Sequence, residues 1–248
     1  MQTLILGSSS PFRAELLAKL HLNFLTASPD IDESPSPNET PDQLVRRLAE
    51  SKARKIADQY PDSLIIGSDQ VAVLNGQVMG KPGNHLKAIE QLSAASGNTV
   101  TFMTGLALFN AATGNMQSEV DYFEVVFREL SAEQIEFYLT TEQPYQCAGS
   151  FKSEGFGISL FKELRGQDPN SLIGLPLIRL IELLANENID VLAQQSEKRL
   201  LGFYSSAIIA FYFFQRFPLL QPELPYYSSS GPLTDGLLLN VNFLPFLQ

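Results

Sequence analysis

One stretch of the chain, LIIGSDQVAVLNGQVMGKP at residues 64–82, constrains the fold more than any other. An apolar run stops at a carboxylate, Asp69, and then resumes before Asn75-Gly76. This dipeptide is a strong predictor of a two-residue β-hairpin loop, so we expect two antiparallel strands joined here. Asp69 therefore interrupts a run of residues that would otherwise be expected in the hydrophobic core.

The hairpin loop also predicts a register. It places Gln70 opposite Lys81. One residue further from the loop, Asp69 would face Pro82. Because side chains alternate along a strand, Asp69 should lie on the other face from Gln70 and Lys81, and a bulge or twist near Gly80 is required if all three bind one ligand.

The N-terminal segment predicts a buried strand, a small-residue loop and a helix. Residues 3–7 are apolar, the loop contains Ser8, and Pro11 suits the first position of a helix. Arg13 would project back toward the loop, where serine hydroxyls and backbone N–H groups favour a phosphate. A lone arginine often only covers the edge of a core, but the serine loop favours the phosphate interpretation.

The next helix carries a lysine on its apolar face. A capping box at Thr40–Gln43 predicts a helix that runs to about Tyr60. Lys52 falls in the middle of its apolar stripe, where an unpaired ammonium costs several kcal/mol. We expect an anionic ligand or a carboxylate partner. The alternative is a lysine whose aliphatic part packs in the core while its ammonium reaches solvent beside the helix.

Two further segments contain charged residues of interest. The acidic, proline-rich segment 30–37 includes Glu33 and has the composition of a solvated connector. The glycine-rich segment 148–157 includes Glu154 and suits a loop whose backbone approaches a ligand closely, although it matches no established phosphate-binding fingerprint.

The remaining pattern predicts an α/β protein with a long, mixed, twisted sheet and flanking helices. The further elements that we expect are helices at 84–96, 131–141 and 174–186 and strands at 24–27, 99–109, 116–127 and 158–164.

Composition excludes several classes of function. The net charge of −10 argues against a general nucleic-acid or anionic-membrane surface. Cys147 is the only cysteine, so no disulfide framework exists, and two histidines cannot form a multi-histidine metal site. The chain starts without a basic leader or a long apolar run, which favours a reducing, cytoplasmic setting.

The character of the chain changes near residue 195. We expect a domain at residues 1–194 and an atypical apolar, proline-rich extension at 195–248 with low order after about Phe217. The extension could pack on the domain or on a partner, anchor the chain in a membrane, or have no selected structure. We rank the membrane anchor last, because the apolar run is shorter than the roughly 20 residues that span a bilayer.

Together these positions favour nucleotide chemistry. Cations and hydroxyls suit a triphosphate, while carboxylates suit a divalent ion that bridges phosphate oxygens. Such a site would hydrolyse an anhydride with a water activated by a metal and an ionised aspartate. The residues concerned are Ser8, Arg13, Glu33, Lys52, Asp69, Lys81 and Glu154.

Six segments in order and spacing resemble the Maf-type nucleoside triphosphate pyrophosphatases. They are SSSPFR at 8–13, DESP at 32–35, LAESKA at 48–53, GSDQVAV at 67–73, GKP at 80–82 and AGSFKSEGFG at 148–157. The resemblance implies a fold similar to inosine triphosphate pyrophosphatase, with two lobes around a cleft, and cleavage of a nucleoside triphosphate with Mg²⁺ or Mn²⁺. It also suggests a homodimer.

The resemblance further implies roles for individual residues. Asp69 would activate water and bind metal, and Glu33 would lie near the metal. Ser8, Arg13, Lys52 and Lys81 would bind phosphates.

Substrate choice in the family is associated with the positions of Phe12, Gln70 and Glu154. The forms GSDQ and SFKSEG resemble the branch that acts on 7-methyl-GTP. An aromatic ring could stack on the cationic methylated base, and Glu154 could accept its N–H donors. The resemblance leads us to expect a tryptophan at position 12, where this chain has Phe12. The alternatives are a dTTP/UTP pyrophosphatase and a nucleotide-binding regulator of cell division or septum formation.

Overall fold

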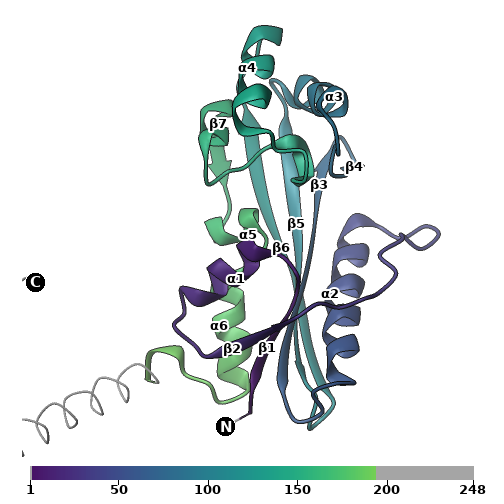
Figure 1. The fold of residues 1–248 in the computed structure, drawn as a ribbon, viewed down its shortest axis with the longest axis vertical. Helices are drawn as coiled ribbons and strands as arrows, with labels where there is room; N and C mark the ends of the chain where they lie inside the picture. The colour runs from purple at the N-terminus through teal and green to yellow at the C-terminus, as the bar shows by residue number, and fades with distance from the viewer. Residues whose placement is uncertain (1, 194–248) are drawn as a thin grey trace, which may run out of the picture. The chain divides into compact units, whose positions relative to one another are not determined.

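The structure is a computed structural model that describes residues 2–193 (Figure 1). The predicted boundary at residue 194 falls at the end of this part, so the extension and its three interpretations lie outside the described residues. Within residues 2–193, no helix is long and apolar enough to cross a membrane.

A mixed, seven-stranded sheet forms the centre of the described chain, in the order β2-β1-β3-β5-β6-β7 with β4 paired to β3. The pairs β1–β2 and β1–β3 are parallel and all other pairs are antiparallel. The strands are β1 (Leu4–Gly7), β2 (Phe24–Ala27), β3 (Leu64–Leu74), β4 (Gln77–Met79), β5 (Thr99–Asn110), β6 (Asn115–Phe127) and β7 (Phe161–Arg165).

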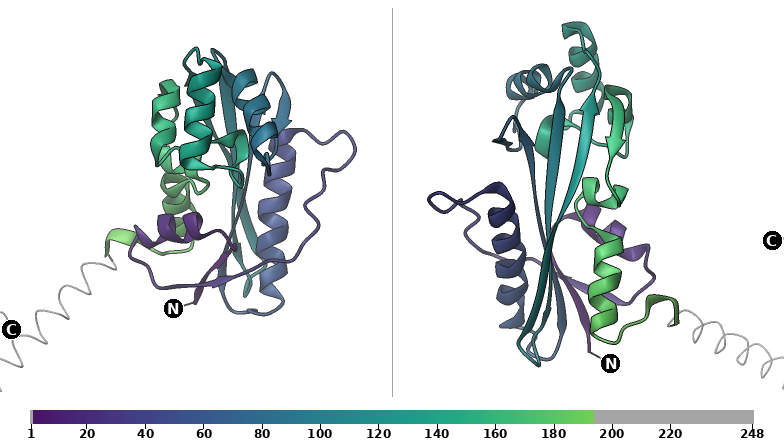
Figure 2. Two further views of the ribbon diagram at one scale, coloured as in Figure 1. Left: turned by 45° about the horizontal axis from the view of Figure 1, so that its top comes forward. Right: turned by 180° about the vertical axis from the view of Figure 1, so that it is seen from behind.

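Helices cover both faces of one half of the sheet (Figures 1 and 2). Helix α2 (Pro41–Ala57) lies on one face, and α1 (Pro11–Ala18) and α6 (Leu177–Asn186) lie on the other. Side-chain alternation along β1 explains this arrangement, because Leu4 and Leu6 pack with the leucines of α1 and α6, whereas Ile5 packs with Ala49 and Ile56 of α2.

The other half of the long strands carries a second lobe with its own core. This lobe contains α3 (His85–Ala95), α4 (Ala132–Glu142), β7 and two short 3₁₀ turns at Ala148–Ser150 and Phe156–Leu160. Its core includes Phe102, Phe123, Tyr138 and Phe161. The predicted fold class, a long mixed sheet with flanking helices in two lobes, is confirmed.

The helices with sequence caps begin where we predicted. The side chain of Ser10 caps α1, and capping boxes form at Thr40 and Ser131. The last strand and the last helix were predicted too early, because residues 156–160 form a 3₁₀ turn and α6 begins only at Leu177. Helix α5 (Pro169–Ile173) was missed, although Asp168 caps it and proline occupies its first turn.

The predicted hairpin register is confirmed only near its loop. Leu74 pairs with Gln77, and the pairing continues to Ala72–Met79, where β4 ends. The predicted pairing of Gln70 with Lys81, and that of Asp69 with Pro82, is wrong.

The chain leaves the sheet after β4 because other partners hold it. The Gly80 carbonyl accepts a hydrogen bond from Gln91 Nε2 at 2.9 Å, and the Gly83 N–H donates to the Tyr145 carbonyl at 2.9 Å. The pairing of β3 with β4 contains no bulge. Lys81 is therefore placed by a loop rather than by the ribbon.

This departure leaves a gap along one edge of β3. Strand β5 pairs with residues 64–73 along one edge, while the other edge is shared by β1 at residues 64–67 and by β4 at residues 72–74. Residues 68–71 have no strand partner on that second edge. Asp69 and Gln70 lie at this gap.

Candidate active site

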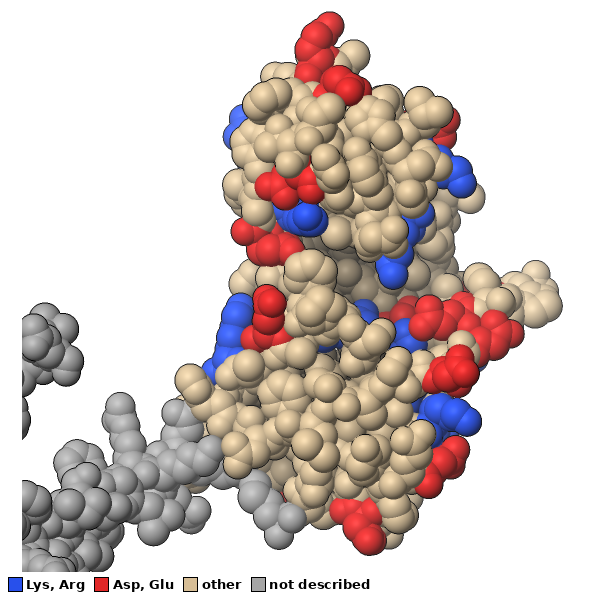
Figure 3. All heavy atoms as spheres, in the orientation of Figure 1, with Lys and Arg blue, Asp and Glu red and all other residues tan. Residues whose placement is uncertain are grey.

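A pocket of about 560 Å³ opens at the gap in the sheet, between the two lobes. Figure 3 shows the hollow, with Lys or Arg atoms inside it and acidic groups at its rim. Every residue that the sequence predicts for the site lines this pocket, namely Ser8, Phe12, Arg13, Glu33, Lys52, Asp69, Gln70, Lys81 and Glu154. The individual roles of these residues stay predictions.

Lys52 connects two carboxylates. Its Nζ lies 2.7 Å from Asp69 Oδ1 and 2.7 Å from Glu33 Oε1. The prediction of a carboxylate partner for this buried lysine is confirmed. An ammonium has three N–H donors, so one remains for a ligand in the pocket.

Glu33 reaches the pocket from the acidic loop. The hydrogen bond from Lys52 holds the pKa of Glu33 below its ordinary value, against the opposing effect of partial burial. The loop itself is held by Glu39, which forms a two-pronged ion pair with Arg47 at 2.6 and 2.8 Å. The composition of this loop is that of a solvated connector, yet it delivers a carboxylate to the site.

Arg13 lies half-buried at the start of α1, where the serine loop meets the pocket. Its Nε donates to the Gly174 carbonyl at 2.8 Å, and one terminal nitrogen lies 3.5 Å from Ser8 Oγ. Burial lowers the pKa of Arg13, while the negative charges of Asp69 and Glu33 act in the opposite direction. No carboxylate among residues 2–193 forms a salt bridge with it, so its remaining N–H donors suit an anionic ligand.

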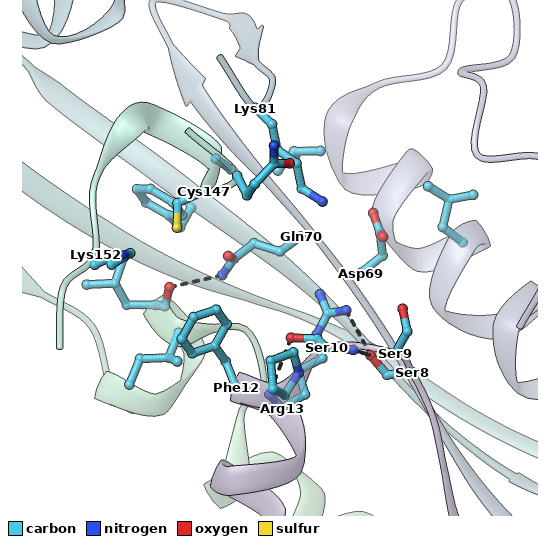
Figure 4. A pocket seen from close by; sticks show the side chains of 18 of the residues that line it. Ser8, Ser9, Ser10, Phe12, Arg13, Asp69, Gln70, Lys81, Cys147 and Lys152 are labelled. Atoms are coloured by element: carbon cyan, nitrogen blue, oxygen red, sulfur yellow. Dashed lines mark hydrogen bonds between the residues drawn. The ribbon is translucent and has the colours of Figure 1, made fainter. Parts of the chain in front are cut away.

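Lys81 is a further cation of the pocket. It lines the pocket from the loop after β4, and no hydrogen bond or salt bridge joins it to another described residue. Figure 4 shows its side chain extending toward the space above Asp69.

Asp69 and Gln70 lie on opposite faces of β3, as strand alternation predicts. Asp69 turns to α2, where it meets Lys52, and Gln70 turns to α5, where its Nε2 donates to the Ser171 carbonyl at 2.6 Å. Both still line the pocket, because the edge of β3 is unpaired there. In Figure 4, Asp69, Ser8 and Arg13 gather on one side of the pocket, while Gln70 and Cys147 lie toward the other.

Glu154 lies on an exposed loop that is tied to the end of α4. The Glu142 carboxylate accepts a hydrogen bond from the Phe156 N–H at 3.0 Å, and Lys152 Nζ donates to the Glu142 carbonyl at 3.1 Å. Apart from a 3.2 Å contact with Ser153 Oγ, Glu154 has no hydrogen-bond partner among residues 2–193. Its carboxylate is therefore available to a ligand.

Sequence reasoning did not single out several polar residues of the pocket, among them Gln146, Cys147, Lys152 and Ser153. Burial raises the pKa of Cys147, which keeps its thiol protonated. Lys152 lies two positions before Glu154 in the sequence. This closeness to a predicted site residue is the one sequence pattern that could have indicated that Lys152 lines the pocket.

The carboxylates of Glu33 and Asp69 are chemically suitable ligands for a divalent cation. Both converge on the Lys52 ammonium, and carboxylate oxygens are the ligands that Mg²⁺ prefers. Residues 2–193 contain no cluster of three or more His, Cys, Asp or Glu side chains arranged for a metal. Two carboxylates suffice where substrate phosphates and water supply the other ligands.

Known proteins resemble this chain over most of its described length. It is 58% identical over 190 residues to a protein of Nitrosococcus oceani named 7-methyl-GTP pyrophosphatase, which covers 77% of this chain and 96% of the relative. It is 60% identical over 189 residues to a protein of Alcanivorax borkumensis with the same name, covering 76% of this chain and 96% of the relative.

Solved structures that match this chain in a structural comparison include a HAM1 protein from Coxiella burnetii. The TM-score is 0.42 at 14% identity, with 75% of this chain and all of that chain covered. The Staphylococcus aureus Ham1 protein gives a TM-score of 0.40 at 13% identity over 62% of this chain and 88% of that one.

The family profile described as Maf-like protein matches residues 3–187, a range that includes every residue lining the pocket. Together with relatives at 58–60% identity, this match shows that the chain belongs to the Maf family.

Proposed function

We propose that this chain hydrolyses 7-methyl-GTP to 7-methyl-GMP and pyrophosphate. The observation that carries the proposal is the pocket, which combines four cations and an aspartate with an aromatic ring and an exposed glutamate. Relatives that are 58–60% identical to it over 189–190 residues bear the name 7-methyl-GTP pyrophosphatase, which supports the same substrate.

Asp69 accepts the proton of the attacking water. The water oxygen forms a bond to the α-phosphorus, and the bond between this phosphorus and the α,β-bridging oxygen breaks. Pyrophosphate leaves with the electron pair of that bond. The hydrogen bond from Lys52 fixes the direction in which the Asp69 carboxylate points, so the base is in place before the substrate binds.

The cations bind the triphosphate and stabilise the charge that develops on the leaving group. Lys52 contributes its third donor, Arg13 contributes the N–H groups not used by Gly174 and Ser8, and Lys81 contributes an unpaired ammonium. A Mg²⁺ or Mn²⁺ ion held by Glu33 and Asp69 would offset further negative charge on the phosphates when bound.

The base lies on the other side of the pocket. Methylated guanine is cationic, so the ring of Phe12 stacks on it and the Glu154 carboxylate offsets its charge or accepts its N–H donors.

The deciding experiment measures pyrophosphate release from 7-methyl-GTP, GTP, UTP and dTTP with Mg²⁺. Asp69→Asn keeps the size of the side chain and removes the base, so we expect a loss of roughly 10²- to 10⁴-fold in kcat. Asp62→Asn, an exposed aspartate that does not line the pocket, is the matched control.

Three outcomes contradict the proposal. Full activity of Asp69→Asn removes the catalytic assignment. A preference for UTP or dTTP assigns the chain to pyrimidine nucleotides. Nucleotide binding without any turnover favours a regulator.

A further inference from the structure

A buried polar network behind the pocket fixes the side chain of Gln70. The Gln70 amide nitrogen lies 2.8 Å from Thr104 Oγ1 and 2.6 Å from the Ser171 carbonyl, with the Leu172 carbonyl further away at 3.4 Å. Thr104 is fully buried on β5 opposite Gln70 in the sheet register, and its hydroxyl donates to the same Ser171 carbonyl at 3.0 Å. The network continues to β6, because the Ser171 hydroxyl donates to the Asp121 carboxylate.

The partners determine which end of the amide faces them. A backbone carbonyl can only accept a hydrogen bond, so the group of Gln70 that faces Ser171 must be the NH₂ group. Because the Thr104 hydroxyl gives its own hydrogen to Ser171, Thr104 can only accept from Gln70. The reversed amide would place its oxygen against two electron-rich oxygens.

The network therefore uses both amide hydrogens of Gln70 and leaves its oxygen available. No hydrogen bond joins this oxygen to any described residue, and no fully buried side-chain oxygen or nitrogen among the described residues lacks a partner. The oxygen is consequently accessible, and the surface that Gln70 lines is the pocket. Figure 4 marks the longer contact of the amide nitrogen, 3.4 Å to the Leu172 carbonyl, on the same side of the amide.

We propose that Thr104 is a positioning residue for base selection, which keeps Gln70 as a pure hydrogen-bond acceptor toward the nucleobase. An acceptor here favours a base edge with N–H donors, such as the ring N–H and amino group of guanine. It disfavours a carbonyl at the same place, such as those on both sides of the ring N–H in uracil. The inference rests on the proposed function and names a determinant of its specificity.

The test compares Thr104→Val with Thr104→Ser. Valine removes the hydroxyl at nearly constant size, which releases the amide hydrogen that Thr104 accepts. Only the long 3.4 Å contact with the Leu172 carbonyl remains for it, so the amide can reorient and offer a donor to the ligand. We expect the ratio of kcat/KM for 7-methyl-GTP over UTP to fall roughly three- to tenfold, the equivalent of one neutral hydrogen bond. The change should appear in KM, while kcat for 7-methyl-GTP stays within about twofold.

Two variants separate positioning from a general effect on the fold. Thr104→Ser keeps the hydroxyl and should restore the ratio. Thr101→Val makes the same change on the same strand, at a residue that does not line the pocket, and should leave the ratio unchanged. An unchanged ratio in Thr104→Val, or an equal loss for both substrates through kcat, overturns the inference.

Calorimetric titration with 7-methyl-GMP and UMP separates this inference from the proposed function. If the wild type releases no pyrophosphate but binds 7-methyl-GMP more tightly than UMP, the proposed function fails. Loss of that preference in Thr104→Val then still supports the role of Thr104, and an unchanged preference overturns it. If the wild type neither releases pyrophosphate nor binds either nucleotide, both proposals are wrong.

Discussion

The ammonium of Lys52 lies 2.7 Å from the carboxylate of Asp69, and their side chains are only 7% and 12% exposed. This ion pair joins the apolar face of α2 to the unpaired edge of β3. We therefore expect it to contribute to stability and to orient the site at the same time, because the same two residues line the pocket.

Lys52→Met should lower both stability and activity. The substitution leaves the buried Asp69 and the nearby Glu33 without their shared cation, so we expect the free energy of unfolding to fall by about 1–3 kcal/mol. This is less than the roughly 3–5 kcal/mol of a fully enclosed pair, because the pocket is open to solvent. Urea denaturation measures the change.

Lys81→Met is the matched control for that variant. Lys81 forms no hydrogen bond or salt bridge with the described residues, so its loss should leave stability within about 0.5 kcal/mol while pyrophosphate release falls. Equal destabilisation by the two variants would show that the Lys52–Asp69 pair does not stabilise the fold.

Gly105→Ala should displace α2 from the sheet. Gly105 pairs with Asp69 across β3 and β5, and a Cβ atom there would lie 2.1 Å from the Val45 carbonyl oxygen of α2. The backbone must move, which costs typically about 1–3 kcal/mol, and the ammonium of Lys52 moves with the helix. We therefore expect a lower melting temperature in thermal denaturation and a lower kcat.

Gly80→Ala provides the corresponding control, since a Cβ at Gly80 meets no atom within 4 Å and its φ is not positive. We expect little change in melting temperature. A stable and fully active Gly105→Ala would mean that α2 adjusts without disturbing the site.

The Glu39–Arg47 ion pair should make stability depend on pH in the acid range. The hydrogen bonds from Arg47 lower the pKa of Glu39 from 4.5 to about 2. A carboxyl group with a lower pKa in the folded state contributes stability that is complete above about pH 4.5 and disappears as the pH falls toward 2.

Glu39→Gln should therefore destabilise the protein at pH 7 and reduce the loss of stability between pH 4.5 and 2. Denaturation at several pH values measures both effects. Glu133 also has a lowered pKa but bonds only to Ser131 and its own backbone, so Glu133→Gln should change the profile much less. Identical pH profiles for Glu39→Gln and the wild type would exclude a role for this pair.

Local patterns in the sequence predicted the helices and the unusual lysine. Caps at Ser10, Thr40 and Ser131 act within one turn, and the position of Lys52 on an apolar face follows from helical periodicity alone. These features depend on neighbouring residues and therefore appear in the sequence.

Contacts between distant segments could not be predicted in the same way. The hairpin register failed beyond Met79 because Gln91 and Tyr145 hold the following loop, and neither belongs to the hairpin. The orientation of Gln70 depends on Thr104 and Ser171, 34 and 101 positions away. The family resemblance indicated the residues of the pocket, whereas the partners that hold them required the structure.

Phe12→Trp should strengthen binding of the methylated base. Phe12 lines the pocket, is 38% exposed, and lies next to Arg13 at the start of α1, where a larger ring can extend into the open cavity. Tryptophan is the best aromatic partner for a cation, and a gain of about 0.5–1 kcal/mol corresponds to a roughly two- to fivefold lower KM for 7-methyl-GTP. The KM for the uncharged base of UTP should change less.

Glu154→Gln tests the opposite side of the base. The carboxylate has no cation partner among residues 2–193. The substitution therefore removes a negative charge that would attract only a positively charged base. We expect kcat/KM to fall more for 7-methyl-GTP than for UTP, and more for 7-methyl-GTP than for GTP, because only the methylated base is positively charged. Glu136→Gln, an exposed glutamate on α4 that does not line the pocket, is the control. Equal losses for all three nucleotides would remove Glu154 from the base site, and an unchanged 7-methyl-GTP to GTP ratio would mean that the carboxylate accepts N–H donors without sensing the charge.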